Sequence, residues 1–342
     1  MAVGELRETI IAGLEQTFPA KMGLEKLVFG DAPEETFDTE TVSVDVFDGT
    51  RGFAKYTARK AKGQVIGLEG WDTVQITPPL IDERFVVTAQ DLKKRGFGES
   101  NINQPLGSKF QNIVNRQLTR LKNRKQLTYN KQIAELITTG KVTIKEYDDK
   151  GNVLATRTED FKMPTTHIYT VDNDWNTELA DIWGDMREID ELIIKDSGLT
   201  PDRALVGKLT IVDMLNNAQI KSLLDNRRIE FGNAFKQTRD DGLIYWGMLD
   251  GKEIYEFQDF DEDGDPMIPE SAYIPFASTF EKDVYYGSQD VINDRGEPDV
   301  QEAKEVVIED TDKEVVAKSW RFKSAKLFAL TQSAAFGHLT TR

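Results

Sequence analysis

The sequence predicts an α+β fold. Three observations support this class: short stretches near the start alternate between apolar and polar residues, one long stretch has helical spacing, and the C-terminal part is mainly strand-like. Helical and strand patterns do not alternate regularly and no internal repeat is present, so a parallel α/β sheet is not expected. A chain of 342 residues exceeds the usual size of one hydrophobic core, and we expect two compact domains with extensions.

Residues 1–36 are predicted to form an N-terminal arm. Its one apolar run consists of Leu24, Leu27, Val28 and Phe29, among Gly and Pro breaks. A run of this size cannot bury a core alone, so we expect the arm to dock on another surface.

Residues 37–90 are predicted to form an extended β-hairpin. Val42, Val44 and Val46 alternate with polar residues, whereas residues 49–70 are rich in Gly, Lys and Arg. This composition favours a projecting loop, which needs a partner surface to become ordered. The basic residues near the tip are Lys55, Arg59, Lys60 and Lys62.

A long helix is predicted from Pro105 to just before Gly140, because proline favours the first turn of a helix and glycine favours its end. The apolar residues at helical spacing are Phe110, Val114, Leu118, Leu121, Tyr129, Ile133, Leu136 and Ile137. Between Lys109 and Ala134 the helix carries no acidic residue, but it carries several basic ones, among them Arg116, Arg120 and Arg124. Such charge is typical of a solvated face, and equally of a face turned toward acidic neighbours or enclosed DNA.

Shorter elements are predicted in the rest of the chain. A hairpin is expected from strands at 142–147 and 153–158, joined by a turn with Gly151. Helices are expected at 176–197 and 212–226, and further strands at 203–207, 243–249, 253–257, 273–276 and 315–330.

The charge balance opposes adhesion to nucleic acid. The chain has 43 Lys and Arg against 59 Asp and Glu, a formal net charge of −16, so sequence-specific DNA binding is disfavoured. Acidity of this degree is also common in soluble proteins. No apolar stretch approaches the ~20 residues that span a bilayer, and we expect no secretion signal. With 0 Cys there is no disulfide or Cys-ligated zinc, which is consistent with a reducing cytosol.

One motif has the spacing of a calcium-binding EF-hand loop: Asp259, Asp261, Asp263, Gly264 and Glu270. Its context is wrong, because residues 253–257 are predicted as a strand and Pro266 and Pro269 obstruct an exiting helix. We therefore interpret these residues as a structural acidic turn and expect no metal or other cofactor.

Catalytic patterns are weak. The two histidines, His167 and His338, lie far apart and have no neighbouring carboxylate pattern, so we expect both to be core or surface residues. No carboxylate pair stands out for carbohydrate chemistry, and the spacing of Trp175 and Trp183 favours core packing. We predict no enzymatic activity.

The order of elements, together with specific residues, resembles the lambda-type family of major capsid proteins of tailed bacteriophages and prophages, which have the Hong Kong 97 shell fold. Residues 37–40 and 42–45 resemble the family's entry into its extended loop, 49–64 the loop, 77–83 the return strand and 116–135 the spine helix. Near the C-terminus, Tyr286, Gly287, Trp320 and the run from Ser324 to Leu327 resemble the closing strand. Lys326 replaces a proline of the family pattern. The resemblance covers about residues 10–335.

The resemblance implies five parts: an N-terminal arm (1–36), an extended loop (37–90), a peripheral domain with the spine helix and a hairpin (91–165), an axial domain (166–280), and a return segment with C-terminal strands of the peripheral domain (281–342). It also implies a structural head protein that self-assembles, as hexamers and pentamers, into an icosahedral shell around double-stranded DNA. The candidate residues for contacts between subunits are Lys55, Arg59, Lys60, Lys62, Arg116, Arg120 and Arg124.

The partners that the resemblance implies are further copies of the chain, a separate scaffolding protein, a portal, a decoration protein and a maturation protease, with DNA enclosed without sequence-specific binding and no membrane partner. The location it implies is the virion, after assembly in the host bacterial cytoplasm. Two alternatives stay open: the shell protein of an encapsulin-like compartment, which shares the fold, and an unrelated acidic protein that binds calcium or acts on carbohydrate.

Overall fold

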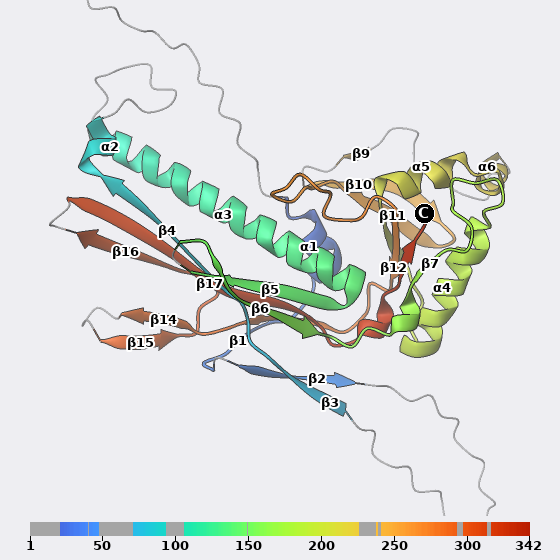
Figure 1. The fold of residues 1–342 in the computed structure, drawn as a ribbon, viewed down its shortest axis with the longest axis horizontal. Coiled ribbons are helices and arrows are strands. Elements are labelled where there is room, and N and C mark those ends of the chain that lie inside the picture. Colours follow the sequence, from blue (N-terminus) through green and yellow to red (C-terminus); the bar gives the residue numbers. More distant parts are fainter. Residues whose placement is uncertain are drawn as a thin grey trace, which may run out of the picture.

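The molecule is elongated, with a long helix on a five-stranded sheet at one end and a seven-stranded sheet with shorter helices at the other (Figure 1). The α+β class predicted from the sequence is confirmed. This computed structural model describes residues 21–39, 41–47, 71–93, 106–148, 150–225, 237–238, 241–292, 297–312 and 316–342.

The helices of the described ranges are α1 (Gly23–Phe29), α2 (Ala89–Lys93), α3 (Leu106–Thr139), α4 (Ile182–Ser197), α5 (Lys208–Asn216) and α6 (Ala218–Asp225). Two 3₁₀ turns are η1 (Thr165–His167) and η2 (Ser333–Ala335). The long helix is confirmed as α3, which spans 34 residues and ends at Gly140, whose φ of 68° suits glycine. None of these helices is long and apolar enough to cross a membrane.

Two predicted helices differ from the structure. The first begins at Ile182 rather than at residue 176, because the Asp181 side chain accepts the Gly184 N–H at 3.1 Å and caps the helix there. The second is two helices, α5 and α6. Asn217 ends α5, and its side-chain oxygen accepts the N–H of Gln219 at 2.9 Å, which starts α6.

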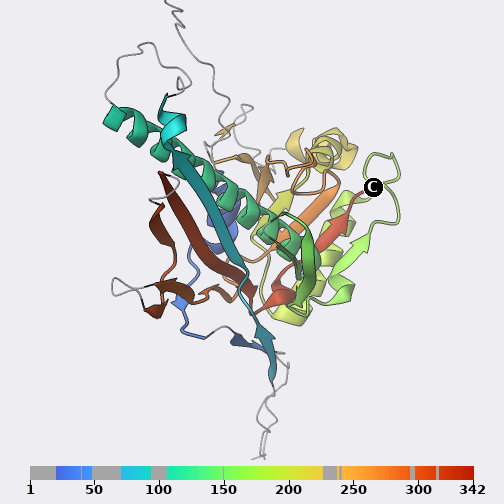
Figure 2. The same cartoon turned by 60° about the vertical axis from the view of Figure 1, so that its left-hand side comes forward.

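The five-stranded sheet is centred on β17 (Ala317–Leu330). The strands around it are β4 (Leu80–Thr88), β16 (Val306–Asp312) and β13 (Lys282–Tyr286), all antiparallel to β17, and β1 (Glu34–Thr36), parallel to β13. Helix α3 covers one face of this sheet (Figure 2). On that face Trp320 stacks on Phe85 at 5.2 Å between ring centroids and meets Phe110 of α3 at 5.5 Å.

The seven-stranded sheet lies between two hydrophobic cores. Its order is β7 (Ile168–Thr170), β18 (His338–Thr340), β12 (Ala272–Phe276), β8 (Arg203–Val206), β11 (Lys252–Phe257), β10 (Leu243–Leu249) and β9 (Gln237–Thr238). Val206 and Tyr273 belong to the core that includes α4, whereas Leu205 and Ile274 belong to the main core shared with α1, α3 and β17. The last strand of the chain, β18, therefore lies in this sheet and not beside β17.

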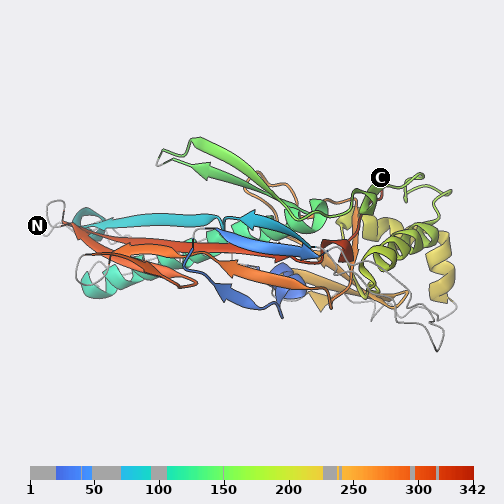
Figure 3. The same cartoon turned by 90° about the horizontal axis from the view of Figure 1, so that it is seen from below.

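Three two-stranded hairpins complete the described structure: β2 (Val42–Phe47) with β3 (Trp71–Ile76), β5 (Lys141–Tyr147) with β6 (Val153–Asp160), and β14 (Gln289–Ile292) with β15 (Pro298–Gln301). The β5–β6 hairpin predicted from the sequence is confirmed, and Figure 3 shows that it starts at the end of α3, turns back along the molecule and projects away from the strands. Strands β2 and β3 flank residues 48–70, which lie outside the described residues.

The apolar run of the predicted arm packs against the rest of the same chain. Leu24 and Val28 of α1 are fully buried in the main core, and Phe29 meets Phe328 of β17 at 4.8 Å between ring centroids. The surface on which this part docks is therefore intramolecular.

Candidate assembly surfaces

Two basic residues of α3, Arg124 and Lys125, pair with acidic residues of their own chain. Arg124 Nη2 lies 2.7 Å from Glu83 Oε1 of β4, and Lys125 pairs with Glu305 just before β16. Arg120 is exposed and Arg116 is half-buried. The sequence left open whether the basic face of this helix is solvated or turned toward acidic neighbours or DNA. For Arg124 and Lys125 the structure shows acidic neighbours within the same subunit. The other predicted contact residues, Lys55, Arg59, Lys60 and Lys62, lie outside the described residues.

Carboxylates of the N-terminal segment pair with lysines that lie far along the chain. Glu25 pairs with Lys326, Asp31 with Lys282 and Glu34 with Lys304. The ion pairs with Lys282 and Lys304 hold the pKa values of Asp31 and Glu34 below their usual range. Together with the parallel pairing of β1 and β13, these contacts fasten residues 25–36 to the body.

Lys326 occupies a cage of aromatic rings. Its Nζ lies 5.3 Å from the ring centroid of Tyr129, 5.5 Å from that of Tyr286 and 4.6 Å from that of Phe328. Aromatic faces attract cations, so the cage and Glu25 together compensate an ammonium whose residue is only 5% exposed. Burial of the two phenols raises their pKa values well above the usual value, so they stay neutral. The departure from the family's proline was visible in the sequence, but its ion-pair partner was not.

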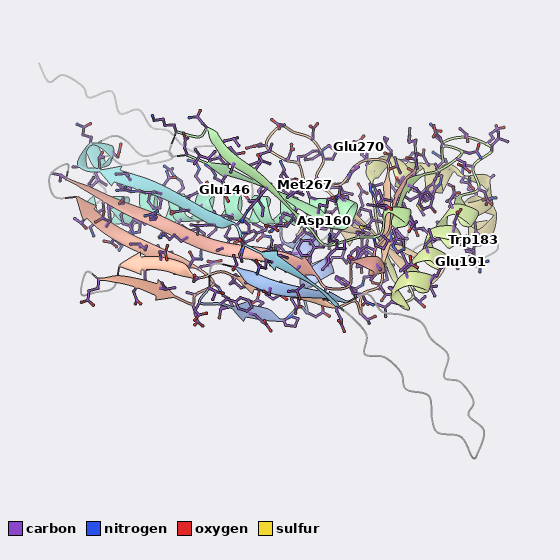
Figure 4. All side chains as sticks on the ribbon, turned by 60° about the horizontal axis from the view of Figure 1, so that its bottom comes forward. Glu146, Asp160, Trp183, Glu191, Met267 and Glu270 are labelled. Atoms are coloured by element: carbon purple, nitrogen blue, oxygen red, sulfur yellow. The ribbon has the colours of Figure 1, made fainter. Side chains whose placement is uncertain are left out.

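The hairpin β5–β6 is braced at its base. Arg157 Nη2 donates to the carbonyl of Thr77 at 2.8 Å, and Glu135 Oε2 of α3 accepts the N–H of Thr143 at 3.0 Å. Figure 4 shows Asp160 at the base of the hairpin and Glu146 farther toward its tip. The hairpin is therefore attached both to α3 and to the segment that precedes β4.

The acidic motif near residue 260 forms a turn closed by its own hydrogen bonds. Asp261 Oδ1 accepts the N–H groups of Asp263 at 3.0 Å and Asp265 at 2.9 Å. Asp259 lies 3.3 Å from Lys21 Nζ and accepts a hydrogen bond from Asn130. Among the described residues, no group of three or more His, Asp or Glu side chains is placed to hold a metal ion.

Both histidines are built into the packing. His167 is fully buried, with its ring nitrogens 2.9 Å from the Phe336 carbonyl and 3.1 Å from Asp196 Oδ2. His338 Nδ1 lies 3.0 Å from the Thr138 carbonyl, and burial lowers the pKa of His338. Both rings bridge chain segments far apart in sequence, which is a structural use.

A buried ion pair lies inside the seven-stranded half. Lys252 of β11 is 1% exposed and pairs with Asp190 of α4. Burial raises the pKa of Asp190 despite the attraction of Lys252. Two buried hydroxyl groups nearby, those of Tyr169 and Tyr273, have no hydrogen-bond partner within the structure. Burial raises the pKa values of both phenols, reinforced at Tyr169 by the charges of Glu188 and Asp185 and at Tyr273 by that of Asp190.

Comparison with known proteins identifies the family. Residues 8–287 match the family model described as phage major capsid protein E, and the chain belongs to that family. No curated protein matches by sequence. The resemblance found in the sequence is thereby confirmed.

Solved structures share the fold. A prophage protein of Escherichia coli CFT073, assigned as a capsid protein, superposes with a TM-score of 0.64 at 12% identity, covering 93% of this chain and 92% of that one. The mature capsid of bacteriophage PhiM1 gives a TM-score of 0.51 at 10% identity, with 92% and 86% covered. The SrpI encapsulin of Synechococcus elongatus PCC 7942 gives a TM-score of 0.48 at 10% identity, with 100% of this chain and 96% of that one covered. The chain is a phage major capsid protein with the Hong Kong 97-like fold.

Proposed function

We propose that copies of this chain assemble, as hexamers and pentamers, into an icosahedral shell that encloses double-stranded phage DNA. The observation that supports this most is the family match over residues 8–287, combined with an elongated subunit from which hairpins project. Many weak contacts between identical copies sum to a stable container, so no single contact needs to be strong.

The proposal assigns a different structural role to each part of the chain. Residues 1–36 are an arm of which the described part is fastened to the body, 37–90 the extended loop, 91–165 the peripheral part, 166–280 the axial part and 281–342 the return segment. The subunit has a structural role and no enzymatic one. DNA is enclosed without sequence-specific binding, which suits a net charge of −16.

The proposed partners beyond further copies are a scaffolding protein, a portal, a decoration protein and a maturation protease. The described part of the arm holds one short helix, α1, which packs into its own subunit. We also propose that scaffolding is supplied by a separate chain, that the shell is assembled in the bacterial cytoplasm, and that its final location is the virion.

Charge reversal in the predicted loop tests the proposal. In residues 281–314, Asp and Glu far outnumber Lys and Arg. Arg59→Glu combined with Lys60→Glu is expected to reduce shell assembly, because the native basic residues would face this acidic segment of a neighbouring subunit. Sedimentation velocity measures the fraction in particles, and circular dichroism checks the fold. The matched control reverses Lys195 and Lys208, two exposed lysines on α4 and α5. Assembly that the loop variant leaves unchanged contradicts the role proposed for the loop.

The contents of purified particles separate a phage head from an encapsulin-like compartment. Particles that hold protein cargo and never package DNA contradict the proposal and favour the compartment.

Calcium binding is tested by calorimetry, where micromolar affinity that is lost in Asp261→Ala would revive the calcium alternative.

A further inference from the structure

Three buried polar atoms in the seven-stranded half have no hydrogen-bond partner among the residues that the structure describes. They are the hydroxyl oxygens of Tyr169 on β7 and Tyr273 on β12, and Oδ1 of Asp190 on α4. Tyr273 is fully buried. Buried polar groups are nearly always hydrogen-bonded, because an unpaired group lowers the stability of the folded state. Three such atoms in one half of the molecule therefore suggest a shared partner.

Both phenols face helix α4. Tyr169 and Tyr273 are the neighbours of Leu339 on its two sides, so the three residues form one row across the sheet. Residues in such a row point to the same face of a sheet. Leu339 and Tyr273 belong to the core that includes α4, and Tyr169 packs against this core. The two hydroxyls are therefore turned toward the helix that carries Asp190.

Asp190 reaches the same space from the helix. It follows Ile189, a fully buried member of this core, and its Oδ2 pairs with Lys252 of β11. Lys252 is two residues before Ile254, another member of the core, so it stands on the same face of the sheet as the phenols. Burial raises the pKa values of both phenols, and Asp190 is among the charges that add to this effect at each. One carboxylate thus lies within electrostatic reach of both hydroxyls.

The chemistry of these groups favours a neutral partner that both donates and accepts hydrogen bonds. A carboxylate oxygen only accepts, whereas each phenol can donate its hydrogen. The ammonium of Lys252 already compensates the charge of Asp190, which disfavours a second cation at Oδ1. A water molecule fits, since a buried water typically makes about three hydrogen bonds to polar groups that lack other partners.

We propose that a water molecule is bound between Asp190, Tyr169 and Tyr273 in the core of the seven-stranded half. The water donates a hydrogen to Asp190 Oδ1 and accepts one from each phenol. It joins α4 to β7 and β12, two strands that β18 separates, and Asp190 extends this network to Lys252 of β11. The site lies within a single subunit, so it does not depend on the proposed shell function.

The sign of one stability change tests the site in the full-length, unassembled chain. Tyr273→Phe removes only a hydroxyl, and the loss of a buried hydrogen bond is expected to raise the unfolding equilibrium constant in urea about fivefold or more. Removal of a hydroxyl that has no partner would instead lower this constant. A constant that falls or stays the same overturns the proposal. The control is Tyr147→Phe, at a tyrosine that is 57% exposed, which is expected to change the constant by less than about twofold.

A second background shows whether Tyr273 and Asp190 share the partner. In the Lys252→Met/Asp190→Leu chain the carboxylate that anchors the water is gone. Adding Tyr273→Phe there is expected to have an effect at least about threefold smaller than in the native chain, because the two groups are coupled through the water. An equal effect in both backgrounds contradicts a shared water.

A crystal structure of the native chain, at a resolution that shows ordered water, gives the direct view and needs no variant. The expected result is one density peak at about 2.5–3.0 Å from both Asp190 Oδ1 and the Tyr273 hydroxyl oxygen. A direct hydrogen bond between phenol and carboxylate, a bound cation, or no peak at this place overturns the proposal.

Discussion

Lys326 Nζ donates a hydrogen bond of 2.6 Å to Glu25 Oε1, across 301 residues of sequence. The contact joins α1 near the start of the chain to the central strand β17 near its end. Because Gln126 of α3 donates to the other oxygen of Glu25 at 2.7 Å, three distant segments meet at one carboxylate.

Replacing Lys326 by Met is expected to lower the free energy of unfolding by about 3 kcal/mol, because Glu25 is left with an uncompensated charge in a largely buried place. Urea denaturation of the unassembled chain measures the loss. Lys318→Met is the control, since the Lys318–Glu309 pair is 43% and 50% exposed and such pairs contribute at most ~1 kcal/mol. Equal effects of the two substitutions contradict the role assigned to the cage.

Acid is expected to loosen residues 31–36 from β13. The pKa values of Asp31 and Glu34 are lowered in the folded chain, so their pairs stabilise it above the unfolded values near pH 4 and this contribution is lost as the pH falls through the folded values. Hydrogen exchange at Val284, whose N–H donates to the Pro33 carbonyl at 2.9 Å, reports the change relative to amides of β4. In Asp31→Asn/Glu34→Gln the weakening should already be present at neutral pH. Protection that is independent of pH in the native chain argues against the pairs.

Removing one member of the buried pair of Lys252 and Asp190 is expected to lower the stability of the fold strongly, whereas replacing both residues is expected to lower it little. Lys252→Met alone leaves Asp190 buried without its partner and should destabilise the chain by about 3–5 kcal/mol. Adding Asp190→Leu removes the second charge and should restore most of the loss. Chemical denaturation of these two variants and the native chain measures the effects, and a double variant as unstable as the single one would refute this account.

His338 is expected to make the folded chain sensitive to mild acid. Burial lowers its pKa, so the folded state favours the neutral ring; stability is full above the unfolded value near 6.5 and declines as the pH falls from there toward the folded value. Thermal unfolding between about pH 8 and 5 should show the decline, and His338→Gln should flatten it. An unchanged profile in the variant would assign the pH dependence to other groups.

Local patterns predicted the elements well where sequence period and capping agree. Helix α3 has helical spacing, a proline before it and a glycine after it, and the β5–β6 hairpin has alternating strands around a turn. Strand β4 emerged from the same reasoning only as part of a longer hairpin. The five-residue helix α2 was missed, because so short a segment carries too little period to detect.

Contacts between distant segments were not predictable from these patterns. Nothing in the sequence around Lys326 indicates Glu25, and the order of the seven-stranded sheet brings together β18 from the end of the chain and β7 from its middle. The residue types in the sequence indicated which groups were unusual. Only the fold shows which residues are their partners.

Negative-stain electron microscopy of the purified, overexpressed chain tests the shell function most directly. The expected result is closed particles of uniform size, or rings of subunits, that become more abundant as the protein concentration rises. A chain that remains a monodisperse monomer at high concentration, with residues 49–70 protected from exchange within the single subunit, would contradict it.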